Sequence, residues 1–118
     1  MAKMLITILG VVFIVVGLLG FFNNPILGIF EVDAMHNVVH LLTGVLALVF
    51  ASKGNGSAKM FAKTFGIIYL LIAVLGFITV PDGGKVLNVI ETNMADHILH
   101  VVLATIFLVI GFSKDRGE

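Results

Sequence analysis

Four long apolar stretches alternate with short polar segments along the chain. They cover residues 4–22, 34–51, 60–80 and 94–112. Each is close to the roughly 20 residues that an α-helix needs to cross a lipid bilayer. The pattern therefore predicts an all-α integral membrane protein, a four-helix bundle in which every apolar stretch is one transmembrane helix.

Composition agrees with a membrane location and excludes several classes of function. Of the 118 residues, 59% are hydrophobic and only 12% are charged, and this apolar surface exceeds what a small soluble domain can bury. The net charge is zero and no basic run is present, which excludes an electrostatic nucleic-acid site. The chain has no cysteine, so disulfides and thiolate metal ligands are excluded.

The basic residues predict the orientation in the membrane. Cytoplasmic segments of membrane proteins are enriched in lysine and arginine. Of the basic residues, only Lys85 lies in a segment predicted on the outer side, between the third and fourth apolar stretches. We therefore expect a multi-pass protein of the cell membrane with both termini and the loop 52–59 in the cytoplasm. The basic residues assigned to that side are Lys3, Lys53, Lys59, Lys63, Lys114 and Arg116.

The two halves of the chain resemble each other. Residues 10–22 align with residues 66–78 at an offset of 56, and after a four-residue insertion His40 aligns with His100 at an offset of 60. We interpret this as a tandem repeat within one membrane domain covering residues 1–118. Repeat one covers residues 4–51 and repeat two residues 60–112. Two parallel helical-hairpin repeats make an up-down-up-down bundle in which the second and fourth helices are parallel and diagonal.

Two shorter apolar segments, 26–30 and 86–90, occupy matching places in the repeats. They are too short to span the bilayer, so we expect them to lie in its outer interface.

Polar residues gather on one face of the second and fourth helices. Ionisable groups are costly in lipid and turn toward the bundle interior, and small residues let helices approach closely. At about 100° per residue, the second helix carries Asp33, His36, Asn37, His40, Thr43, Gly44, Ala47 and Ala51 on this face, and the fourth carries Asn93, Asp96, His97, His100, Ala104, Phe107 and Gly111.

His40 and His100 lie at equal depth, about 9 Å inside the outer ends of their helices at 1.5 Å per residue. At similar depth, the first and third helices carry the small residues Gly17 and Ala73. The missing side-chain volume leaves space for a flat cofactor, or else permits close helix packing.

Three interpretations of the histidines stay open from the residues alone. In the first, His40 and His100 are axial ligands of a haem. In the second, a transition metal is bound by His36, His40, His97 and His100, with Asp96 as a further ligand. In the third, the imidazoles only form hydrogen bonds between helices, with Asn37 and Gly44 as supporting residues of the site in every case.

No serine–histidine–acid arrangement or phosphate-binding loop is visible, so the sequence does not indicate an enzyme. The alternatives to a cofactor protein are a structural or scaffolding membrane subunit, as a homo-oligomer or in a larger complex, and a proton-coupled transporter. The helices predicted for this chain lack the Gly/Pro interruptions of most transporters.

Two ordered motifs resemble a known family. The block from His36 to Gly44 (HNVVHLLTG) and the block from Asp96 to His100 (DHILH) resemble the bacterial domain of unknown function 4383 family. The resemblance covers nearly the whole chain and implies a small four-helix membrane protein without an assigned activity. It also implies that Asn37, His40, Asp96 and His100 occupy the family's polar positions. His97 stands where asparagine is usual, so a four-histidine site is not implied as a family trait.

Overall fold

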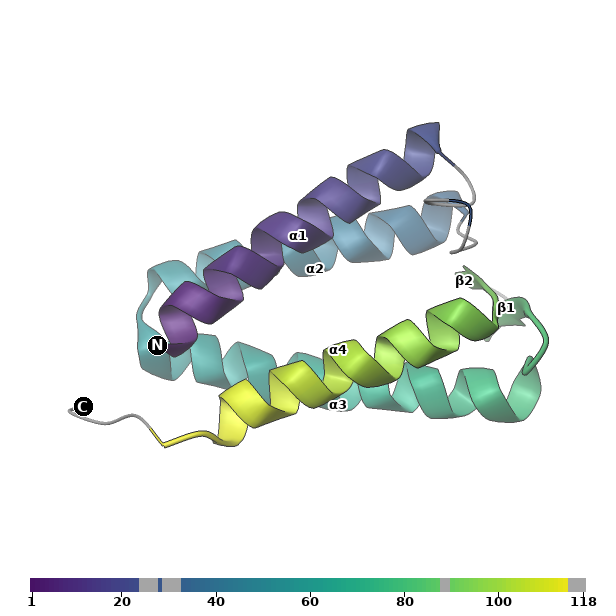
Figure 1. The fold of residues 1–118 in the computed structure, drawn as a ribbon. Coiled ribbons are helices and arrows are strands. Elements are labelled where there is room, and N and C mark those ends of the chain that lie inside the picture. Colours follow the sequence, from purple (N-terminus) through teal and green to yellow (C-terminus); the bar gives the residue numbers. More distant parts are fainter. Residues whose placement is uncertain (24–27, 29–32, 88–89, 115–118) are drawn as a thin grey trace.

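The computed structural model describes residues 1–23, 28, 33–87 and 90–114. Each of its four helices is long and apolar enough to cross a membrane. This confirms the predicted all-α membrane bundle. In chain order the elements are α1 (Ala2–Phe22), α2 (Ala34–Ser52), α3 (Asn55–Thr79), β1 (Gly84–Val86), β2 (Ile90–Thr92) and α4 (Met94–Phe112) (Figure 1).

The helices form two hairpins, α1 with α2 and α3 with α4 (Figure 1). Glycines allow the backbones within a hairpin to approach. A Cβ on Gly44 would lie 2.7 Å from the carbonyl oxygen of Gly10, and a Cβ on Gly66 would lie 2.8 Å from the side chain of Leu108. Between the hairpins, most backbone contacts are made by α3, which touches both α1 and α2. Small residues therefore hold each hairpin together, as is common in membranes.

Aromatic rings fill the space between the hairpins. Phe13 of α1 packs against Tyr69 of α3 and Phe107 of α4, with ring centroids 5.5 and 5.7 Å apart. Phe61 continues this cluster at 5.7 Å from Phe107. All four side chains are buried, whereas the outward faces of the helices expose aliphatic residues. An apolar exterior around a packed core suits a lipid environment.

The start of α1 and the end of α4 lie at the same end of the bundle as the α2–α3 turn (Figure 1). The amino-terminal nitrogen of Met1 and the backbone N–H of Lys3 donate to Asn55 Oδ1 at 3.2 and 2.8 Å. Lys59 Nζ donates to the carbonyl oxygen of Ser113 at 2.6 Å. Met1, Ser113 and this turn therefore lie at one end of the bundle, and both termini are predicted on that side. Their location in the cytoplasm stays a prediction.

The α2–α3 turn is shorter than the predicted loop 52–59, because α3 begins already at Asn55. Only Lys53 and Gly54 connect the helices. Gly54 has φ +117°, a conformation that residues with a Cβ rarely adopt. This glycine makes the tight reversal, and the polar residues after it extend the helix by about one turn.

The opposite end carries a small β-hairpin where an interfacial segment over 86–90 is expected. β1 and β2 pair antiparallel with Gly84 opposite Thr92. Lys85 on β1 lies 4.0 Å from the carboxylate of Asp33 at the start of α2, which links this hairpin to the other half of the molecule. The predicted segment 26–30 lies outside the described residues except for Gly28.

Candidate metal centre

Polar caps fix the starts of the two helices that carry the histidines. At α2, the Asp33 carboxylate accepts from the backbone N–H of His36 at 2.8 Å. At α4, Asn93 and Asp96 form a capping box, in which each side chain accepts from the backbone N–H of the other residue at 2.9 Å. Such caps satisfy backbone donors that a helix leaves open. His36 thus lies on the capped first turn of α2, and His40 and His100 lie on the second turns of their helices.

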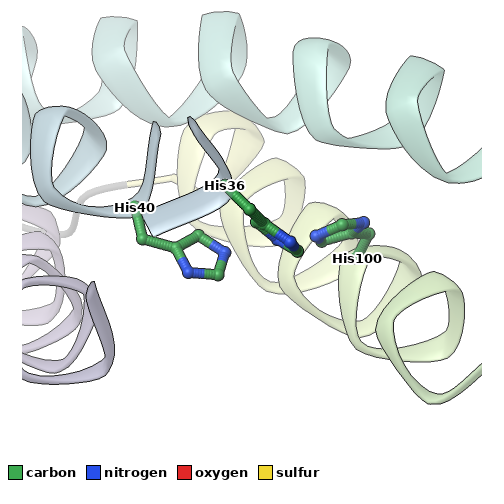
Figure 2. Close-up of side chains that lie close together, drawn as sticks. All are labelled: His36, His40 and His100. Carbon is green, nitrogen blue, oxygen red and sulfur yellow. The ribbon is translucent and has the colours of Figure 1, made fainter. Parts of the chain in front are cut away.

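The structure brings His36, His40 and His100 together inside the bundle (Figure 2). The ring centroid of His36 lies 4.5 Å from that of His40 and 5.5 Å from that of His100, and His40 and His100 are 6.4 Å apart. One nitrogen from each ring lies within 4.8 Å of the other two. All three side chains are at most 2% exposed. This three-histidine cluster is the candidate site.

One hydrogen bond sets the tautomer of His36. Its Nδ1 lies 2.7 Å from the carbonyl oxygen of Glu91 on β2. A carbonyl only accepts, so Nδ1 carries the proton and a neutral ring has its lone pair on Nε2. A backbone carbonyl that orients one ring nitrogen is a common outer partner of metal-binding histidines. The same bond ties α2 to the other hairpin.

His40 has no hydrogen bond at either ring nitrogen, among the residues that the structure describes. It is 2% exposed, and its ring lies against those of His36, His100 and Phe13. Leaving a buried polar group without a partner costs about 1–3 kcal/mol. His100 Nδ1 is in the same situation. The cluster therefore contains nitrogen atoms that have no hydrogen bond to any residue in the described part of the chain.

His97 and Asp96 lie outside this cluster. The Nε2 of His97 lies 2.7 Å from the carbonyl oxygen of Val80 and donates to it, so His97 ties α4 to the end of α3. Its ring rests on Gly76, where an added Cβ would overlap the imidazole. Asp96 is engaged in the helix cap described above. Of the five residues predicted as metal ligands, the structure groups His36, His40 and His100.

The predicted supporting residues serve helix packing. A Cβ on Gly17 would lie 2.7 Å from the Leu41 side chain, so the missing volume is used for the close approach of α1 and α2. Gly44 makes the corresponding approach to Gly10 and Ile14. Ala73 is fully buried on α3. The sequence left two interpretations of Gly17 and Ala73, space for a flat cofactor or close helix packing. The geometry around Gly17 fits close packing.

In the predicted alignment of the two halves, Asn37 matches His97 at an offset of 60. Asn37 rests on Gly20 as His97 rests on Gly76, since a Cβ on Gly20 would overlap the Asn37 amide. Gly20 and Gly76 are themselves 56 residues apart, the offset of the aligned first helices. The tandem repeat itself stays a prediction.

Sequence reasoning missed Tyr69 as a neighbour of the site. Its hydroxyl lies 2.8 Å from Thr43 Oγ1, which itself donates to the carbonyl oxygen of Val39, so Tyr69 is the donor to Thr43. Its ring centroid is 5.7 Å from that of His100. The signal was available: Tyr69 is the single tyrosine of the chain and aligns with Phe13 in the repeat.

The packing around His40 and His100 does not fit a haem. The His36 ring touches both, and the rings of Phe13 and Tyr69 pack against His40 and His100 respectively. A porphyrin between the two imidazoles would have to take the space that these rings fill. The described residues therefore suit a single small ion better than a macrocycle.

Comparisons with known proteins give a family and no assigned activity. The family model described as "Domain of unknown function (DUF4383)" matches residues 3–113. Curated proteins and solved structures give no match. Because the match covers nearly the whole sequence and agrees with the four membrane helices, the chain belongs to the DUF4383 family.

Proposed function

We propose that this membrane protein binds a transition-metal ion through His36, His40 and His100. The observation that carries the proposal is His40, which lies between two further imidazoles and whose two buried nitrogens make no hydrogen bond to the residues that the structure describes. Buried polar groups that the protein leaves unsatisfied often mark an ion or a water. A metal ion satisfies a lone pair on each of the three rings at once.

The geometry needs only a small contraction to bind an ion. Zinc lies about 2.0–2.1 Å from histidine nitrogen, which places two ligand nitrogens of a tetrahedral site about 3.3 Å apart. The three nitrogens now lie within 4.8 Å of one another. Binding an ion therefore requires the three nitrogens to move closer together by at most about 1.5 Å. Imidazole ligands suit zinc, copper, iron and nickel.

The test is metal content of the protein purified from its native membrane and reloaded with zinc or copper(I) in nanodiscs. We expect wild type to bind one ion per chain, and His40→Leu, His36→Leu and the double variant His40→Leu/His100→Leu to lose it. His97→Leu is the matched control, because it removes a buried histidine of the same bundle outside the cluster. Retention of the ion by the double variant, or equal loss in His97→Leu, contradicts the proposal.

A second candidate function is that of a structural subunit. It is favoured by the hydrogen bonds that His36 Nδ1 and His97 Nε2 make to backbone carbonyls. His36 bonds Glu91 and His97 bonds Val80, each joining different elements by backbone carbonyls. In this case the polar residues tie the hairpins together, and the apolar outer faces pack against lipid, further copies or a larger complex. Wild-type protein without metal, together with a stable and unchanged double variant, would decide for this function. A proton-coupled transporter is a weaker proposal, since α1 to α4 are continuous helices.

A further inference from the structure

A cavity opens beside the three-histidine cluster between α1 and α4. Its volume is about 70 Å³, and it is lined by Val12, Phe13, Val16, His40, Leu99 and Leu103. A single water needs roughly 10–15 Å³ of such space. The cavity is thus large enough for a molecule of a few non-hydrogen atoms and too small for a typical metabolite, whose pockets are roughly 300–1,000 Å³.

The position of this cavity connects His40 with the lipid side of the bundle. Val12 on α1 is 47% exposed, and Val16, Leu99 and Leu103 are half-buried, whereas His40 is buried. The backbones of α1 and α4 make few contacts with each other, far fewer than the helices within either hairpin. Five of the six lining residues are apolar, and the sixth is an imidazole without a hydrogen bond. A neutral molecule that dissolves in lipid can use this route, while a hydrated ion cannot.

We infer that the metal held by the three histidines keeps an open coordination position toward this cavity, and that a small neutral molecule, diatomic in size, reaches it from the bilayer. The inference rests on the proposed metal site. Three protein ligands with a vacant fourth position are the arrangement of metal sites that bind exogenous molecules. The end of a lipid acyl chain fits the same space, but it has no atom that binds a metal or an imidazole nitrogen.

Carbon monoxide is the probe, and copper(I) is the probe metal because it accepts three nitrogen ligands and binds carbon monoxide as a fourth. Protein in nanodiscs is loaded with copper(I), its copper content is measured, and the infrared C–O stretching band is recorded against carbon monoxide concentration. We expect a single saturable band in wild type. Val16→Phe fills the cavity, so it should keep its copper and bind carbon monoxide at least tenfold more weakly.

Val15→Phe is the matched control, since Val15 is the adjacent residue, is 56% exposed and does not line the cavity. It should behave as wild type. Copper-loaded wild type without the band, equal binding in Val16→Phe, or a band that appears only after lipid is removed would each overturn the inference. A protein that takes up zinc but not copper(I) would overturn it while leaving the proposed function standing. A protein that takes up neither metal contradicts both.

Discussion

At the scale of single residues, the environment of each histidine separates its role from that of its neighbours. His36 and His97 both hydrogen-bond a backbone carbonyl through one nitrogen. Only His36 directs its ring toward two further histidines, whereas His97 packs on Gly76. Four histidines that look alike in the sequence therefore divide into a cluster of three and a single packing residue.

Gly76 is expected to tolerate no side chain. A Cβ there overlaps the His97 imidazole, so Gly76→Ala must displace this ring and weaken its bond to Val80. Overpacking of this kind costs about 1–3 kcal/mol. Unfolding in mixed micelles by a denaturing detergent measures the loss. Gly56→Ala is the control, because its Cβ would meet nothing within 4 Å; equal stability of the two variants would contradict the prediction.

Tyr69→Phe should lower the free energy of unfolding by about 0.6 kcal/mol, the average for a hydrogen bond between membrane helices. The hydroxyl that it removes donates to Thr43 and joins α3 to α2. Unfolding of Tyr69→Phe, Thr43→Val and the double variant forms a double-mutant cycle. We expect the double variant to be less destabilised than the sum of the single ones. Strict additivity would show that the two hydroxyls do not interact.

At the scale of elements, the caps of α2 and α4 decide where the histidines stand. Asp33 and the Asn93–Asp96 pair fix the first turns, and the hairpin β1–β2 supplies the carbonyl that orients His36. The first strand of this hairpin begins within residues 82–85, the four-residue insertion predicted for the second half of the chain. Secondary-structure ends, more than the helix interiors, shape the cluster.

Asp96→Ala should therefore destabilise α4 without removing a metal. Loss of a capping side chain costs about 0.5–2 kcal/mol, and Asn93→Ala should cost a similar amount because both belong to one capping box. The measurements are unfolding stability and metal content on the same samples. Thr105→Ala on the exposed face of α4 is the control. If Asp96→Ala lost the ion at unchanged stability, Asp96 would be a ligand rather than a cap.

At the scale of the whole molecule, the α2–α3 turn joins the two helical hairpins at the end where α1 starts and α4 ends. Met1 and Lys3 bind Asn55, and Lys59 binds Ser113. Toward the other end, the histidine cluster combines residues of both helical hairpins, and β2 binds His36 of the first helical hairpin. The candidate site is thus built where one half of the chain meets the other.

Ser57→Cys and Asp82→Cys should be labelled from opposite sides of the membrane. The chain has no native cysteine, and both positions lie outside the membrane helices or at their ends. An impermeant maleimide on intact cells should label position 82 and reach position 57 only after the cells are opened, because the lysines favour a cytoplasmic turn. The reverse pattern would invert the proposed orientation.

The hydrophobic pattern by itself determined the four helices, because each must be apolar over the full width of a bilayer. It also placed the histidines on inward faces, since a period of 3.6 residues leaves little freedom about which side a polar stripe takes. The sequence could not distinguish the packing role of His97 from the place of His40 in the cluster. That difference depends on the carbonyl of Val80, which His97 binds, and on Gly76, against which its ring packs. Nor could it place Tyr69 or Glu91 near the site, or the cavity between α1 and α4. These features arise from contacts between segments that are far apart in the chain, and helical periodicity does not predict such contacts.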